Sequence, residues 1–175
     1  MRRLFNIGAV VAALALQVPW LTRAAPLLDE GVQIRSNPTA KAPTVLFMCP
    51  HGAAKSVLAS AYFERAAKER GLNVRVLSAG TEPDAAVSPK VASHLEKQGY
   101  KVPAAKPRKV TPEDLASADV VISLGCDLKG LPAPKGRLLS WDDVPGPSED
   151  FAGADARIRD RVVELIEEMV REQKR

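Results

Sequence analysis

The chain has 175 residues and a formal net charge of +4, with 46% hydrophobic and 5% aromatic residues. This length is enough for one domain with a buried core. The first 24 residues contain three arginines and no acidic residue, so the rest of the chain has a net charge of only +1. No basic stripe with interleaved aromatic residues remains, which argues against a nucleic-acid-binding protein.

The N-terminal segment has the pattern of a secretory signal peptide. Arginines follow the first methionine, residues 4–21 form an uncharged and mostly apolar run, and residues 22–24 place small residues where signal peptidase cleaves. The alternative is an uncleaved membrane anchor, because the apolar run approaches the length that spans a bilayer. We expect membrane contact only through this segment, if it is not cleaved. We expect a secreted or periplasmic protein with a signal peptide at 1–24, an irregular arm at 25–41 and an α/β domain at 42–175.

The most informative stretch is Cys-Pro-His-Gly-Ala-Ala-Lys-Ser at residues 49–56, between an apolar run and a helical pattern. A loop that runs from a strand into a helix directs backbone N–H groups and the positive end of the helix dipole at one point. This environment favours the thiolate form of Cys49, which is the nucleophilic form. Lys55 adds positive charge, and the Ser56 hydroxyl can donate to the sulfur. The alternative is a cysteine that serves as a small core residue.

Apolar runs alternate with helical patterns along the chain, which predicts an α/β fold with a parallel sheet and helical crossovers. Ser88-Pro89 and Thr111-Pro112 mark helix starts, and Gly71 and Gly99 mark helix ends. The expected strands are Thr44–Met48, Val74–Ser78, Val120–Leu124 and Arg137–Ser140. The expected helices cover about 55–70, 89–99, a short stretch from 112, and a last one with Ile158, Val162, Leu165, Ile166 and Met169 on one face.

Candidate site residues follow three of these strands. Ligands bind beyond the carboxyl ends of parallel strands, where Cys49 follows the first strand and Cys126 the third. If these strands are neighbours, the two sulfurs face one crevice, either as nucleophile and resolving thiol or as a structural disulfide of an exported protein. Asp142 and Asp143 follow the fourth strand, where one could act as general acid or both could simply shape a turn.

The two histidines are weaker signals. His51 lies in the anion-binding loop, where it can fix the loop or flank a substrate, and it is not expected to be a base. His94 lies in the middle of a helix and is predicted to be a surface residue. We expect neither a metal ion nor a cofactor.

An ordered set of motifs resembles the low-molecular-weight protein tyrosine phosphatase superfamily, and within it the arsenate reductase branch, over about residues 44–168. The family signature is a cysteine, five residues, an arginine and a serine, and the corresponding residues are Cys49, Lys55 and Ser56. His51 is similar to the reductase variant of this loop. Three further segments resemble family motifs: Ser78-Ala79-Gly80-Thr81, Leu124-Gly125-Cys126-Asp127 and Trp141-Asp142-Asp143.

This resemblance implies a three-layer sandwich with a four-stranded parallel sheet flanked by helices. It also implies that Cys49 is the nucleophile, that Ser56 stabilises its thiolate, and that Asp142 or Asp143 acts as acid and then as base. The residues expected to bind a phosphorylated or other oxyanion substrate are His51, Gly52, Ala53, Ala54, Lys55 and Ser56.

Three departures from the family pattern stand out. Lys55 replaces the arginine and keeps a point charge without the planar fork that holds two oxygens. Gly52 replaces an asparagine. The Asp-Pro of the acid loop becomes Asp-Asp-Val-Pro at residues 142–145, and an alignment with one gap places Gly146 opposite the acid.

Cys126 resembles the second cysteine of the reductases, but Gly130 occupies a usual place of their third.

The sequence therefore leaves three functions open. The leading prediction is an exported phosphatase that hydrolyses phosphomonoesters through a phosphocysteine at Cys49. The second is a thiol-dependent arsenate reductase that uses Cys49 and Cys126. The third, suggested by Lys55, is a non-catalytic oxyanion-binding module.

Overall fold

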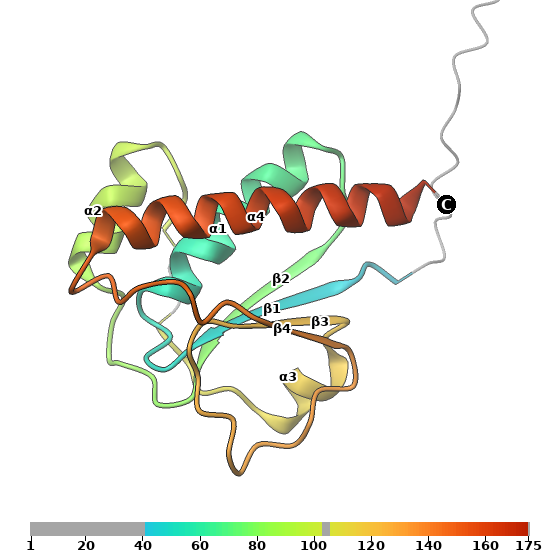
Figure 1. Cartoon of the computed structure of the whole chain (residues 1–175), viewed down its shortest axis with the longest axis horizontal. Coiled ribbons are helices and arrows are strands. Elements are labelled where there is room, and N and C mark those ends of the chain that lie inside the picture. Colours follow the sequence, from blue (N-terminus) through green and yellow to red (C-terminus); the bar gives the residue numbers. More distant parts are fainter. Residues whose placement is uncertain (1–40, 103–105, 175) are drawn as a thin grey trace, which may run out of the picture. The chain divides into compact units, whose positions relative to one another are not determined.

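A computed structural model describes residues 41–102 and 106–174. The predicted signal peptide and all but the last residue of the predicted arm lie outside this range. The described chain forms one four-stranded sheet in the order β2-β1-β3-β4, and all three strand pairs are parallel (Figure 1). The elements are β1 (Thr44–Cys49), α1 (Lys55–Glu69), β2 (Arg75–Gly80), α2 (Pro89–Lys97), α3 (Pro112–Ser117), β3 (Val120–Ser123), β4 (Arg137–Ser140) and α4 (Phe151–Gln173).

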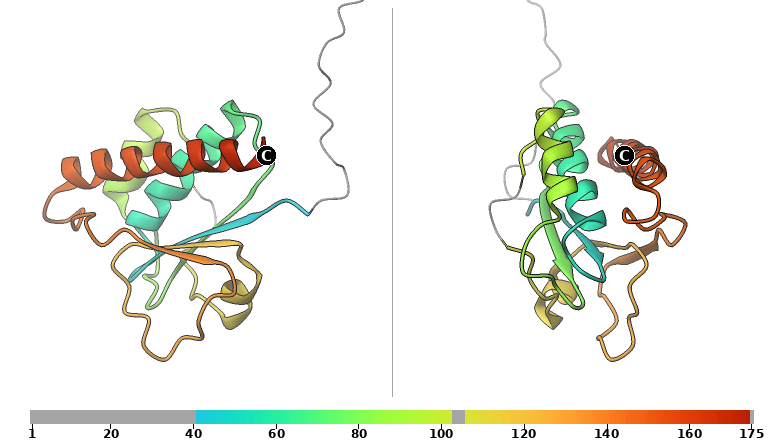
Figure 2. Two further views of the ribbon diagram at one scale, coloured as in Figure 1. Left: turned by 45° about the vertical axis from the view of Figure 1, so that its right-hand side comes forward. Right: turned by 90° about the vertical axis from the view of Figure 1, so that its left-hand side faces the viewer.

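The sheet lies between two layers of different size, which confirms the predicted fold class (Figure 2). On one face, α1 contacts β1, β2 and α4, and α2 packs against α1. On the other face lie the short α3 and the long loop between β3 and β4. Among the described residues, no helix combines the length and hydropathy that a membrane span requires.

The central strand β1 is buried on both faces, which explains its continuous apolar run. Because side chains alternate along a strand, Val45, Phe47 and Cys49 point into the core beneath α1 and α4. Leu46 and Met48 point into the smaller core on the α3 side. Cys49 is therefore the last residue of the strand, with its side chain on the α1 side.

The strand order places the predicted site residues at one edge of the sheet. β1 pairs with both β2 and β3, so the loops that follow these strands meet beside Cys49. The amide of Leu124, just after β3, donates to the carbonyl oxygen of Met48 at 2.8 Å. The two cysteines were expected to face one crevice if their strands are neighbours. The strands β1 and β3 are neighbours, so this condition is met.

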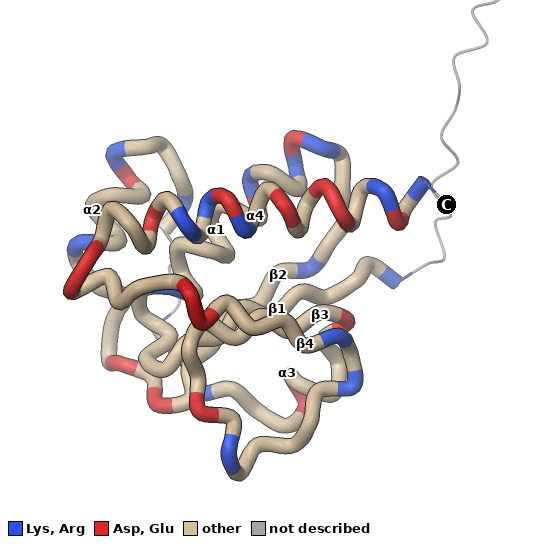
Figure 3. The backbone as a smooth tube through the Cα atoms, viewed as in Figure 1, with Lys and Arg blue, Asp and Glu red and all other residues tan. Residues whose placement is uncertain are grey.

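Basic and acidic residues are interspersed along the long helix α4 (Figure 3). Arg137 of β4 forms an ion pair with Glu168 at 2.5 Å, and Arg161 pairs with Asp143 at 3.0 Å. These pairs tie α4 to the edge strand β4 and to the loop that follows it.

Candidate active site

The loop between β1 and α1 is held by the segment that follows β2. Three of its carbonyl oxygens accept hydrogen bonds from backbone amides of that segment. These bonds are Glu82 N–H to Pro50 O at 2.8 Å, Asp84 N–H to His51 O at 3.0 Å, and Ser88 N–H to Ala53 O at 2.9 Å. We call residues 82–88 the supporting segment.

These bonds fix the direction of the loop amides. In a trans peptide the C=O and the following N–H point in opposite directions. The N–H groups of His51, Gly52 and Ala54 therefore point away from the supporting segment. Among the described residues, none of these three amides donates to a protein acceptor, and the N-terminus of α1 has no side-chain cap. Unpaired amides beside a helix N-terminus form an anion-binding cradle.

Cys49 lies at the base of this cradle. Only 3% of the residue is exposed, and its Sγ lies 3.3 Å from the Oγ of Ser56, which is fully buried. A hydroxyl at this distance can donate to the sulfur when the cysteine is a thiolate. The role of Ser56 in stabilising the thiolate stays a prediction.

A close approach of two glycines keeps the loop in place. Gly52 has a φ of +59°, a conformation that favours glycine. A Cβ on Gly80, the last residue of β2, would lie 2.6 Å from Gly52 N and 2.9 Å from Pro50 O. No side chain fits at Gly80 while the loop keeps this path. The Ser-Ala-Gly-Thr motif is the sequence signal for this contact, whereas the supporting segment was not predicted.

Lys55 extends from the end of the cradle toward the loops after β3 and β4. Its Nζ donates to the carbonyl oxygen of Val144 at 3.4 Å. It also lies 3.2 Å from the position that a Cβ of Gly125 would occupy. The predicted oxyanion contact of Lys55 remains a prediction, because the ammonium group is held here by other loops.

Cys126 is half-buried, and its sulfur is not joined to Cys49 in a disulfide. Its backbone amide donates to the Ser123 hydroxyl at 3.3 Å. Burial raises the pKa of the Cys126 thiol to about 11, the neighbouring Cys49 acts in the same direction, and Ser123 and Lys55 act against it. Cys126 packs against the apolar residues on the α3 side of the sheet, whereas Cys49 belongs to the core on the α1 side.

The two candidate acids point to different partners. Asp143 forms ion pairs with Arg161 at 3.0 Å and Arg157 at 3.5 Å. The hydrogen bond from Arg161 is the main cause that holds the pKa of Asp143 below its usual range. Asp142 accepts a hydrogen bond from the Ser140 hydroxyl. A general acid must be protonated before it reacts, so the ion pairs of Asp143 oppose that role.

The histidines lie in different environments. His51 is exposed at the rim of the cradle, with Nδ1 3.4 Å from an Asp84 carboxylate oxygen. The prediction that His94 is a surface residue is wrong. Its Nε2 lies 3.1 Å from the Tyr62 hydroxyl and 3.0 Å from Asp155, because α2 packs against α1 and lies close to the start of α4.

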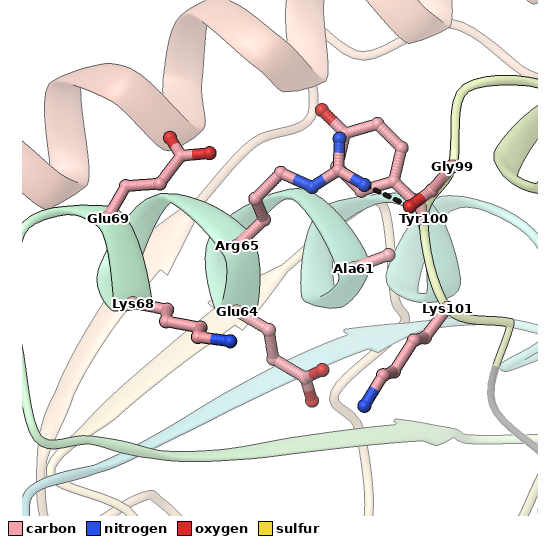
Figure 4. Close-up of a pocket in the computed structure, with 8 residues that line it drawn as sticks. All are labelled: Ala61, Glu64, Arg65, Lys68, Glu69, Gly99, Tyr100 and Lys101. Atoms are coloured by element: carbon pink, nitrogen blue, oxygen red, sulfur yellow. Dashed lines mark hydrogen bonds between the residues drawn. The ribbon is translucent and has the colours of Figure 1, made fainter.

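A groove of about 560 Å³ lies apart from the cradle, on α1 and the turn after α2 (Figure 4). Arg65 stacks over the Tyr100 ring at 3.5 Å, and Glu64 lies opposite Lys101. Within the described part of the chain, no group of three or more His, Cys, Asp or Glu side chains is placed to hold a metal ion. No predicted site residue lines this groove.

The cradle, with its buried cysteine at the end of a parallel strand, can be compared with known proteins. A family profile described as low molecular weight phosphotyrosine protein phosphatase matches residues 44–136, more than half of the chain. The chain belongs to this family. The predicted family is confirmed, and so is its fold.

The proteins similar to this chain include both arsenate reductases and phosphatases. A protein of Halobacterium salinarum named "Putative arsenate reductase" is 31% identical over 127 residues, which cover 70% of this chain and 89% of the relative. The thioredoxin-dependent arsenate reductase of Corynebacterium glutamicum has a TM-score of 0.61 and 29% identity, with 74% of this chain and 62% of that one covered. The chain thus spans less than two thirds of that reductase. A low-molecular-weight phosphotyrosine phosphatase of Vibrio cholerae shares the fold, with a TM-score of 0.63, 23% identity and 73% and 96% covered.

Proposed function

We propose that this family member is a thiol-dependent arsenate reductase. The observation that carries the proposal is a second thiol at the site. Cys126 lies in the loop after β3, the neighbour of β1, and Cys49 is the last residue of β1. The Halobacterium protein named "Putative arsenate reductase" and the Corynebacterium arsenate reductase, at 31% and 29% identity, support this assignment.

In the first step, the amides of His51, Gly52 and Ala54 hold the arsenate oxygens while the Cys49 thiolate attacks the arsenic atom. Convergent N–H groups stabilise the charge that develops on these oxygens. A sulfur–arsenic bond forms and one arsenic–oxygen bond breaks. The released oxygen leaves as water after it takes up protons from the solvent. The product is an arsenic(V) thioester of Cys49.

In the second step, the Cys126 thiolate attacks the sulfur of Cys49. A disulfide forms and the sulfur–arsenic bond breaks, with its electron pair left on arsenic. Arsenic(V) is thereby reduced to arsenite, and the two thiols are oxidised. An external thiol then reduces the disulfide by exchange. We also propose export, on the basis of the leader sequence at residues 1–24, so this thiol has to act in the same compartment.

Phosphatase activity is the second candidate, because the same cradle can bind phosphate. It is favoured by the family profile and by the fold shared with the Vibrio phosphatase. Phosphoester hydrolysis also needs an acid for the leaving oxygen, and Asp143 is paired with Arg161. Asp142 is the other candidate. A protein that binds both oxyanions and converts neither would be the third candidate, an oxyanion-binding module.

A single-turnover experiment tests the proposed function. The reduced domain is mixed with excess arsenate without any added thiol, and arsenite and the linked peptides are quantified. We expect one arsenite per protein molecule and an equal amount of the Cys49–Cys126 disulfide, and neither product from Cys49→Ser. Arsenite without the disulfide, or hydrolysis of an aryl phosphate without arsenite, would contradict the proposal.

A further inference from the structure

His51 is held at two points by one residue of the supporting segment. The Asp84 amide donates to the His51 carbonyl oxygen at 3.0 Å, and an Asp84 carboxylate oxygen lies 3.4 Å from His51 Nδ1. The preceding Pro50 is fixed as well, because its carbonyl oxygen accepts from the Glu82 amide at 2.8 Å and from the Thr81 hydroxyl at 3.4 Å. The residues after β2 therefore set the path of the backbone at His51.

The contact with Asp84 also orients the imidazole ring. The two ring nitrogens point in different directions, and the partner of one nitrogen decides what the other can do. A carboxylate beside Nδ1 favours a proton on that nitrogen. Nε2 then points away from the supporting segment, as the amides of the cradle do. In the parts of the chain that the structure describes, no protein group forms a hydrogen bond with His51 Nε2.

The ring stands at the rim of the cradle, within reach of an anion held there. His51 is two residues from Cys49, and its own amide belongs to the cradle. Its side chain is 65% exposed. A ring that is open to solvent quickly regains a proton that it has given up, so it can act in every turnover.

The two aspartates of the loop after β4 are engaged elsewhere. Trp141 and Val144 anchor this loop in the core, and the Val144 amide donates to the Trp141 carbonyl oxygen at 3.2 Å. Between these anchors, Asp142 accepts from the Ser140 hydroxyl and Asp143 is paired with two arginines of α4. An oxygen that leaves the central atom of an oxyanion therefore needs another proton donor.

From this arrangement we propose that His51 donates a proton to the oxygen that leaves arsenic, and that Asp84 is the residue that positions its ring. The inference rests on the proposed arsenate reduction and adds a catalytic residue to its first step. An imidazolium group is an effective proton donor near neutral pH. This role differs from that of a base, which the sequence did not suggest for His51.

The step balances without a further reactant. The Cys49 thiolate supplies the electron pair of the sulfur–arsenic bond. The Nε2 proton of the imidazolium passes to an arsenate hydroxyl oxygen, which leaves as water with the electron pair of the broken arsenic–oxygen bond. The neutral imidazole then takes up a proton from the solvent. With inorganic phosphate the same step gives a phosphocysteine, and its reversal by a solvent water exchanges one phosphate oxygen.

Oxygen exchange on ¹⁸O-labelled inorganic phosphate tests the role, because it reports the first step whether or not arsenate is reduced. The reduced protein is kept in unlabelled water, and the loss of label is followed by mass spectrometry. At about pH 6, His51→Gln should exchange about a hundredfold more slowly than the unchanged protein. The ratio of the two rates should fall toward one at about pH 9, where an imidazole is neutral. A purely structural role would leave this ratio independent of pH.

His94→Gln is the matched control, because it makes the same change at the other histidine, and it should exchange at the original rate. Asp84→Asn keeps the backbone bond to His51 and should slow exchange about threefold at about pH 6, since an exposed ion pair holds the ring only weakly. Circular dichroism shows whether each variant is folded, and calorimetry with inorganic phosphate shows whether it keeps the cradle.

A rate ratio that does not change with pH, or an unchanged rate in His51→Gln, would overturn the inference even if the protein releases arsenite. Equal slowing in His94→Gln would also overturn it, because the effect would then not be local. The same holds if the unchanged protein exchanges no oxygen, since the adduct of Cys49 would not form. A pH-dependent ratio in a protein that releases no arsenite would retain the role of His51 and refute the proposed reduction.

Discussion

Replacing Gly80 with alanine is expected to lower oxyanion affinity and turnover a hundredfold or more, although Gly80 has no side chain that could touch a substrate. The new Cβ would lie 2.6 Å from Gly52 N and 2.9 Å from Pro50 O, so the loop has to move. A displacement of about 1 Å in a preorganised site commonly costs this much in rate. The clash should also lower the free energy of unfolding by about 1–3 kcal/mol, measured by denaturant titration.

Gly146→Ala is the matched control. A Cβ at Gly146 would meet its nearest atoms, those of Glu149 and Ser148, at 3.6 Å or more, and its φ is not in the left-handed region. This variant should retain affinity, turnover and stability. If Gly80→Ala also retained its phosphate affinity, the contact between β2 and the cradle would have no role in anion binding.

Cys126→Ser is expected to reduce multiple-turnover arsenite release on the order of a thousandfold or more, because the hydroxyl cannot expel arsenic from Cys49 by forming a disulfide. Arsenite is quantified in the presence of an external thiol. The affinity for inorganic phosphate, measured by calorimetry, should stay close to that of the unchanged protein. Serine is nearly isosteric with cysteine, and the cradle belongs to a different loop.

Asp127→Asn serves as the control for the Cys126 loop, because it changes the adjacent exposed residue and leaves both thiols in place. Arsenite release at the original rate in Cys126→Ser would eliminate Cys126 as the resolving thiol. It would direct attention to the external thiol as the group that attacks the arsenic adduct of Cys49.

The fold was predictable because its signals are local. The buried strand β1 gives an unbroken apolar run, and Arg137–Ser140 coincides with the predicted fourth strand. The boundaries that differ depend on pairing between strands. Cys49 pairs with Gly80 in the ladder, which extends β1 and β2 beyond their predicted ends at Met48 and Ser78.

The candidate site was predictable only in part. Cys49, Ser56 and the amide cradle follow from the order strand, loop, helix. The partners of Asp143 and Lys55 do not, because Arg161 is 18 residues from Asp143 and Val144 is 89 residues from Lys55. His94 likewise finds Asp155 only after α2 and α4 have packed. These contacts form only when the helices, strands and loops pack together, so no periodic pattern in the sequence predicts them.

We expect the amides of His51, Gly52 and Ala54 to bind an anion above Cys49, and an NMR titration tests this expectation. Inorganic phosphate is added to the ¹⁵N-labelled, reduced domain, and the backbone amide shifts are followed. The arrangement predicts that these three amides show the largest downfield shifts and saturate together. Saturation of other amides, such as those of the groove at residues 99–101, with these three unchanged would contradict it.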